Sequence, residues 1–223
     1  MFIAERIINV VAPHNCLGCG SEGSILCGWC SNDAFLPLPP RCYRCYAQTA
    51  DSAVCKKCRP QVRLSHVWVA TEYKSMAKKL IYSFKFERAQ AAAPILASYM
   101  LNSLPYLAEA VIVPIPTATS RKRQRGYDHT ELLARCLARE TRLEVCSALG
   151  RTGQSRQVGS KRAQRRKQLQ NAFHAVRPQD ISGKHVLLVE DIVTTGATLE
   201  AAAKTLKTAG AKRVSAVVFA QSQ

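Results

Sequence analysis

Val186–Leu199, with the sequence VLLVEDIVTTGATL, decides how this chain folds. An apolar run ends in two adjacent carboxylates, Glu190 and Asp191, and a short turn rich in Thr and Gly then leads into a helical pattern. The backbone N–H groups of Thr194–Thr198, the threonine hydroxyls and the N-terminus of the helix can all face a phosphate. The two carboxylates can accept hydrogen bonds from ribose hydroxyls. This stretch therefore predicts a strand, turn and helix that bind a ribose 5-phosphate.

Strands and helices alternate on either side of this unit. Apolar strand patterns occur at 66–73, 110–115, 185–192 and 214–219, and apolar residues at helical spacing occur at 76–84, 91–104, 132–137 and 198–209. Strands that are apolar on both faces and alternate with helices are typical of a parallel sheet covered on both sides. The 186–199 stretch has neither the Gly-Lys-Ser/Thr of a P-loop nor the Gly-x-Gly-x-x-Gly of a Rossmann fingerprint. We therefore expect an α/β fold with a different phosphate site.

Eight of the ten cysteines form four Cys-x-x-Cys pairs within residues 16–58. Each pair can donate two thiolates and two pairs complete a tetrahedral shell, so the sequence predicts two structural zinc ions. The spacing allows a cross-braced arrangement or sequential sites, which we favour, and iron–sulfur binding is the minor alternative. The predicted zinc ligands are Cys16, Cys19, Cys27, Cys30, Cys42, Cys45, Cys55 and Cys58.

A change in composition marks a domain boundary near residues 62–65. The segment before it is rich in Cys, Gly and Pro, and the segment after it shows the strand and helix periodicity. We expect a zinc-binding module at 1–63 and the α/β domain at 64–223. No apolar stretch reaches the roughly 20 residues that a membrane helix needs. We therefore expect a cytoplasmic protein that is not inserted into a membrane.

The 186–199 stretch closely resembles the motif that binds 5-phosphoribosyl-1-pyrophosphate (PRPP) in type I phosphoribosyltransferases. The resemblance implies that Glu190 and Asp191 hold the ribose and are the catalytic pair if the protein is an enzyme. It also implies that Mg²⁺ accompanies PRPP and bridges its pyrophosphate and ribose. The residues implied to bind the 5-phosphate are Thr194, Thr195, Gly196, Ala197 and Thr198.

Other motifs extend the resemblance over nearly the whole chain. Val113–Pro116, the basic run Arg121–Tyr127, Tyr73 with Lys85-Phe86, and the four cysteine pairs are similar to the ComF family of competence proteins. Members of this family combine a double zinc ribbon with a phosphoribosyltransferase-like domain and are associated with DNA uptake in natural transformation. The resemblance implies that this protein binds PRPP and single-stranded DNA and works with proteins of the DNA-uptake machinery.

The charge of the chain agrees with a polyanionic partner. Lys and Arg number 32 against 15 Asp and Glu, and the segment Pro116–Lys167 alone holds 14 basic and 4 acidic residues. The basic arm, which we define as Arg151–Lys167, contains no aromatic residue, so we expect it to contact a DNA backbone without reading the sequence. It could instead close over pyrophosphate or be only a solvated hinge. The expected nucleic-acid contacts are Lys161, Arg162, Arg165, Arg166 and Lys167.

Two functions remain open from the sequence. In one, the protein is an enzyme that transfers phosphoribose to an acceptor, and a group of cations lies beside the leaving pyrophosphate. In the other, which we favour, it handles single-stranded DNA and PRPP is a regulator or a vestige. His129 is predicted to be a polar residue at a helix start and not a catalytic group. The cations expected near the pyrophosphate are Arg121, Lys122, Arg123 and Arg125.

Overall fold

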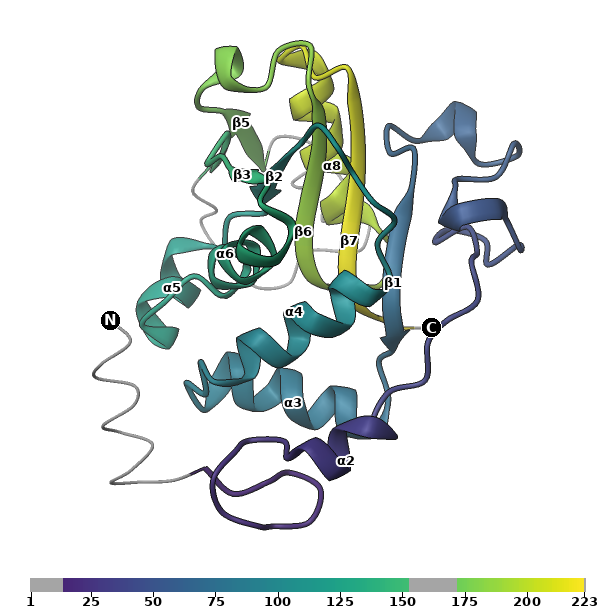
Figure 1. Ribbon diagram of the computed structural model, residues 1–223. Coiled ribbons are helices and arrows are strands. Elements are labelled where there is room, and N and C mark those ends of the chain that lie inside the picture. Colours follow the sequence, from purple (N-terminus) through teal and green to yellow (C-terminus); the bar gives the residue numbers. More distant parts are fainter. Residues whose placement is uncertain (1–13, 153–171, 223) are drawn as a thin grey trace, which may run out of the picture.

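The computed structural model describes residues 14–152 and 172–222, and its centre is a five-stranded sheet (Figure 1). All strands of this sheet run parallel, in the order β1-β7-β6-β2-β3. Its strands are β1 (Val67–Glu72), β2 (Ala110–Pro114), β3 (Glu144–Val145), β6 (His185–Val193) and β7 (Arg213–Gln221). The strands β4 (Leu149–Arg151) and β5 (Phe173–Ala175) form a separate antiparallel pair.

Helices cover both faces of the sheet, as Figure 1 shows. On one face, α3 (Ser75–Phe86), α4 (Ala92–Asn102) and α6 (His129–Thr141) pack against strand residues such as Leu187 and Phe219. On the other face, α8 (Ala197–Thr208) packs against residues such as Leu188 and Val218. Because neighbouring residues of a strand point to opposite faces, a strand covered on both sides is apolar at every position. The predicted α/β fold with a parallel sheet is therefore confirmed.

The predicted strands and helices are all present, with small differences at their ends. The helix α5 (Thr119–Arg125), the strand β3 and the β4–β5 pair were not predicted. The sequence of α5, TSRKRQR, has no apolar face, and β3 has only two residues, so neither leaves a periodic pattern. The α5 helix ends at Gly126, whose φ of 84° is a left-handed conformation that favours glycine.

The cysteine-rich segment contacts both faces of the α/β core. Cys16 and Phe35 belong to the apolar core on the α3 and α4 side, whereas Cys42 and Tyr43 belong to the core on the α8 side. The division of the chain at residue 63 stays a prediction. The short helices of the chain are α2 (Gly28–Asn32) and the 3₁₀ turns η1 (Ala50–Ser52), η2 (Arg59–Gln61) and η3 (Pro178–Asp180). Among the described residues, no helix is both long enough and apolar enough to cross a membrane.

Candidate phosphate and metal sites

The carboxylates of Glu190 and Asp191 lie near the carboxyl end of β6, as the sequence predicts. Asp191 is only 2% exposed, and its carboxylate forms an ion pair with the ammonium group of Lys85, near the end of α3. The imidazole Nε2 of His129 lies 3.6 Å from Asp191 Oδ1 and 4.0 Å from Glu190 Oε1. The fold therefore surrounds the acidic pair with basic groups from two helices.

His129 is the first residue of α6, which confirms that it lies at a helix start. Its imidazole and the carboxylates of Glu190 and Asp191 also lie within 4.8 Å of one another. Its Nδ1 lies 2.9 Å from the hydroxyl of Thr117 and 2.9 Å from the guanidinium of Arg125. Asp128 caps the helix by accepting from the Glu131 N–H and also accepts from the Thr117 hydroxyl. These contacts fix the imidazole beside the carboxylates, a placement that no local sequence pattern indicates.

The two carboxylates differ in their affinity for a proton. Burial raises the pKa of Glu190 well above its ordinary value, and the neighbouring charge of Asp191 adds to this effect. Burial also acts to raise the pKa of Asp191, but the charges of Lys85 and His129 outweigh it and hold that pKa well below the ordinary value. One negative charge is thus held firmly at Asp191, and Glu190 retains a proton more readily.

The turn after β6 has the form expected for a phosphate-binding loop. Thr194 and Thr195 are exposed, and Gly196 has a φ of 74° immediately before the first residue of α8. A Cβ at Gly196 would lie 2.4 Å from a ring carbon of Tyr43, so both the backbone conformation and the packing require glycine. Ala197 and Thr198 form the first turn of α8, where backbone N–H groups have no acceptor within the helix.

A cavity of about 810 Å³ lies beside the acidic pair. Its cationic lining consists of Lys85, Arg121, Arg125 and Arg151. Of the four cations predicted near pyrophosphate, Arg121 and Arg125 line the cavity, whereas Lys122 and Arg123 of the same helix do not. Lys161, Arg162, Arg165, Arg166 and Lys167, the predicted nucleic-acid contacts, lie outside the described residues.

The eight paired cysteines form two four-sulfur clusters with the sequential grouping that the sequence favours. Cys16, Cys19, Cys27 and Cys30 form one cluster, and Cys42, Cys45, Cys55 and Cys58 form the other, with sulfur atoms within 4.8 Å of one another in each. The backbone N–H groups of Cys27 and Cys19 lower the pKa of the Cys16 thiol to about 6, which favours the thiolate form that binds metals. Both clusters are suited to a structural metal ion.

The second cysteine cluster is connected directly to the turn between β6 and α8. The hydroxyl of Tyr43, the residue after Cys42, donates a 2.6 Å hydrogen bond to Glu200 Oε1 on α8. The backbone N–H of Arg63 donates to Glu200 Oε2 at 2.8 Å. Because the Tyr43 ring also packs on Gly196, this cluster supports both the turn and the helix that follows it.

Comparisons with known proteins agree with this architecture. The model of the phosphoribosyl transferase domain matches residues 132–223. The chain is 26% identical to competence protein ComFC of Bacillus subtilis, covering 86% of this chain and 88% of that protein. It is 28% identical to ComFC of Streptococcus pneumoniae (87% and 86% covered) and 27% identical to the DNA utilization protein YhgH of Escherichia coli K12 (75% and 84% covered).

Solved structures with a detectable likeness include an amidotransferase and a phosphoribosyl transferase. Glutamine PRPP amidotransferase from Bacillus subtilis is 21% identical, with a TM-score of 0.42, over 58% of this chain and 26% of that one. Hypoxanthine phosphoribosyl transferase of Trypanosoma cruzi is 20% identical, with a TM-score of 0.35, over 60% of this chain and 65% of that one. The chain thus spans about a quarter of the amidotransferase.

The parallel sheet, the acidic pair before a Thr- and Gly-rich turn, and the domain match define a protein with a phosphoribosyltransferase domain behind two four-cysteine clusters. Within that class, the chain is similar over most of its length to the competence protein ComFC and to the DNA utilization protein YhgH.

Proposed function

We propose that this protein binds PRPP at the carboxyl end of β6 and handles single-stranded DNA during DNA uptake. The observation that supports the PRPP site most strongly is the position of Glu190 and Asp191, directly before the exposed turn that leads into α8. The first turn of α8 would receive the 5-phosphate, and the two carboxylates would accept from the ribose hydroxyls. The cations that line the adjacent cavity would face the pyrophosphate.

Metal ions have two roles in this proposal. Zinc would fill the two cysteine clusters, because four thiolates make a closed tetrahedral shell that leaves no open position for catalysis. Mg²⁺ would arrive with PRPP and neutralise part of its pyrophosphate charge, and the carboxylates of Glu190 and Asp191 are the oxygen ligands that Mg²⁺ prefers. The ion pair between Lys85 and Asp191 must then open or shift when PRPP binds.

The DNA part of the proposal is supported by the relatives and by charge. The relatives are named as competence and DNA utilization proteins, and this chain carries a formal net charge of +17. Proteins of the uptake machinery are the expected partners, and the protein would work on the cytoplasmic side. Titrating PRPP and a fluorescent single strand on one preparation, each as a competitor of the other, tests whether both ligands bind. Binding of neither would end the proposal.

Neutralising the basic arm should weaken the salt dependence of DNA binding. Phosphate contacts release counterions, so the log–log slope of affinity against salt is roughly 0.7 per phosphate on a single strand. Changing Lys161, Arg162, Arg165, Arg166 and Lys167 together to Gln should therefore flatten the slope by several contacts, up to about 3.5. Fluorescence anisotropy of a labelled oligonucleotide from low to moderate salt measures this slope. Equal slopes for the variant and the wild type would show that the arm is only solvated surface.

Phosphoribosyl transfer to an acceptor is the second candidate function. It is favoured by the aromatic side chains of Tyr73 and Phe86, which line the same cavity as Arg121 and Arg125 and offer an apolar wall to an acceptor. In this reaction a nucleophile of the acceptor would form a bond to C1 of the ribose, and the bond from C1 to pyrophosphate would break. Release of pyrophosphate from PRPP in the presence of candidate bases would support phosphoribosyl transfer. If no pyrophosphate is released with any base, a binding role is favoured.

A further inference from the structure

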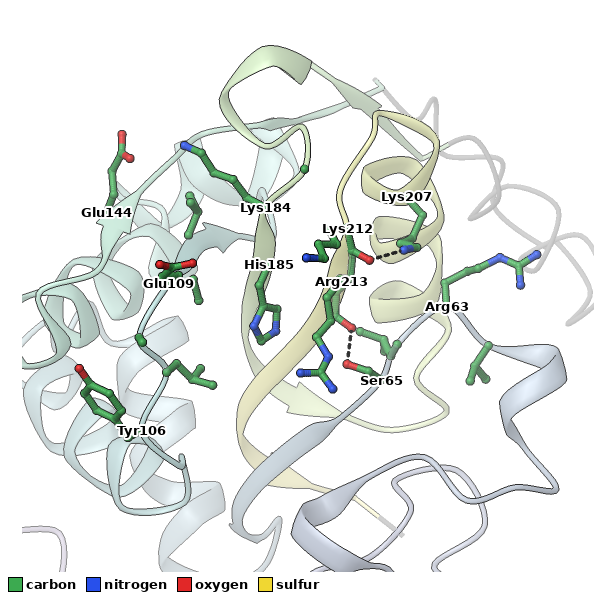
Figure 2. A pocket seen from close by; sticks show the side chains of 18 of the residues that line it. Arg63, Ser65, Tyr106, Glu109, Glu144, Lys184, His185, Lys207, Lys212 and Arg213 are labelled. Carbon is green, nitrogen blue, oxygen red and sulfur yellow. Dashed lines mark hydrogen bonds between the residues drawn. The ribbon is translucent and has the colours of Figure 1, made fainter.

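A large cavity lies at the amino edge of the sheet, away from the carboxylate pair (Figure 2). Its volume is about 1050 Å³, and it is lined by the first residues of four strands, Ala110 of β2, Glu144 of β3, His185 of β6 and Arg213 of β7. Because these strands are parallel, their amino ends share one edge of the sheet and the phosphate-binding turn lies at the other. We call this cavity the amino-edge groove, and it is distinct from the proposed PRPP site.

The amino-edge groove carries a strong excess of positive charge. Its ionic lining consists of Arg59, Arg63, Lys184, Lys207, Lys212 and Arg213, with Glu109 and Glu144 as the acidic residues. The ammonium of Lys207 donates to the backbone carbonyls of Ala211 (3.1 Å) and Lys212 (2.8 Å). Within residues 14–152 and 172–222, none of the other five cations forms a salt bridge. Their charges are therefore available to an anionic ligand.

Most of the charges are separated along the groove, as Figure 2 shows, and Lys184 lies between the two ends. Lys207, Lys212 and Arg213 lie together at the end formed by α8 and β7, whereas Glu109 and Glu144 lie at the end formed by β2 and β3. An anion would therefore be directed to the β7 end. The acidic end would repel it and leave room for an uncharged part of the ligand.

The floor of the groove is polar and uncharged. His185 Nε2 lies 3.0 Å from the Ser215 hydroxyl, which lies 2.7 Å from the Ser65 hydroxyl, and Ser65 in turn donates to the Val214 carbonyl. Burial lowers the pKa of His185 to about 4, and the charge of Arg213 adds to this effect. At neutral pH the imidazole of His185 is therefore neutral, and the floor of the groove carries no charge of its own.

An exposed aromatic ring lines the same groove. Tyr106, in the segment that precedes β2, is 92% exposed although its ring is large and mostly apolar. Proteins that bind single strands combine a positively charged groove with aromatic side chains on which bases stack. We propose that the amino-edge groove binds the sugar–phosphate backbone of a single-stranded nucleic acid at its β7 end, with a base stacked on Tyr106.

The spread of the cations favours a chain of phosphates over a single one. Lys184 precedes β6, Lys212 precedes β7, and Arg59 and Arg63 come from the segment after the second cysteine cluster. Because these cations come from three separate segments that line one groove, together they can contact more than one phosphate. This inference rests on the DNA binding in the proposed function, but it adds a contact surface that PRPP does not share.

The test is a charge-neutralised groove in the full-length, metal-loaded protein. The variant Lys184→Gln/Lys212→Gln/Arg213→Gln should bind a labelled thymidine oligonucleotide at least about tenfold more weakly, with a salt slope lower by about 2, because each lost phosphate contact contributes roughly 0.7. PRPP affinity, measured by calorimetry on the same preparation, should be unchanged. Saturating PRPP should not displace the oligonucleotide from the groove.

The matched control removes three charges elsewhere. Lys78, Lys79 and Lys204 are exposed and do not line the amino-edge groove, so their replacement by Gln should leave the affinity within about threefold of the wild-type value. Equal losses in the two variants would show a general effect of net charge and overturn the proposal. If the groove variant binds the oligonucleotide with wild-type affinity and the basic-arm variant binds it more weakly, the proposal for the groove is wrong. The proposed function would then stand. Failure of the wild type to bind any oligonucleotide would end both.

Two further experiments identify the kind of ligand that the groove binds. Replacing Tyr106 with Ala should weaken binding by between about fivefold and about a hundredfold, whereas Tyr106→Phe, which keeps the ring, should preserve it. A dinucleotide or free pyrophosphate should compete far more weakly than the long oligonucleotide. Competition by pyrophosphate at equal concentration would point to a small-anion site, and competition by polyglutamate would point to an acidic protein surface. Either result would overturn the assignment to a single strand.

Discussion

Replacing Glu190 and Asp191 together with Ala should weaken PRPP binding by at least about a hundredfold. Each carboxylate would accept hydrogen bonds from the ribose, and a hydrogen bond to a charged group contributes about 1.5–3 kcal/mol. Calorimetric titration with PRPP in the presence of Mg²⁺ measures the loss. A control in which Asp33 and Glu140, two exposed acids, are changed to Ala should bind as the wild type does. Unchanged affinity in the first variant would show that the site assignment is wrong.

The same substitution should also affect stability, which the sequence alone does not predict. The sequence places Asp191 in a ligand-binding motif, but in the structure its carboxylate is also buried and paired with Lys85. Removing one partner of a buried ion pair typically costs about 3–5 kcal/mol. The single variant Asp191→Ala should therefore unfold at lower urea, and the pair Lys85→Met/Asp191→Asn should regain most of the lost stability. This double variant separates loss of ligand contacts from loss of folding.

The two cysteine clusters should differ in their effect on PRPP binding. Elemental analysis should find about two zinc ions per chain, because eight thiolates fill two tetrahedral shells. Cys16→Ser and Cys42→Ser should each lose about one zinc ion and the stability that it provides. Only Cys42→Ser should also weaken PRPP binding, by at least about tenfold, because Tyr43 packs on Gly196 and holds Glu200.

The Cys16→Ser variant is the control for general destabilisation. The sequence predicts that either substitution leaves the α/β domain folded, and the contacts of Tyr43 add the expectation that only Cys42→Ser disturbs the turn before α8. Equal PRPP affinity in both variants would contradict the link between the second cluster and the turn. A zinc content of one or none in the wild type, with all eight thiols free to react, would contradict the metal assignment.

The sequence predicted those features that arise from local patterns. The strands β1, β2, β6 and β7 and the helices α3, α4, α6 and α8 follow from apolar periodicity, and the cysteine clusters follow from the spacing of neighbouring pairs. The acidic pair and the Gly196 turn are likewise local, because a strand that ends in two carboxylates places them at one edge of the sheet.

Contacts between distant segments could not be predicted in this way. Lys85 and Phe86 are part of the family resemblance, but only the packing of α3 on the sheet places Lys85 against Asp191. His129 joins the acidic pair because α6 begins beside the carboxyl end of β6. The amino-edge groove consists of cations from separate turns, each of which resembles ordinary solvated surface in the sequence.

A crystal structure of the protein soaked with PRPP and Mg²⁺ would test directly whether PRPP binds at the carboxyl end of β6. We expect one PRPP molecule per chain, with its 5-phosphate at the backbone N–H groups of 194–198 and its ribose hydroxyls on Glu190 and Asp191. We also expect Lys85 to move away from Asp191 in the complex. Electron density for PRPP in the amino-edge groove, or no bound PRPP at saturating concentration, would contradict the assignment.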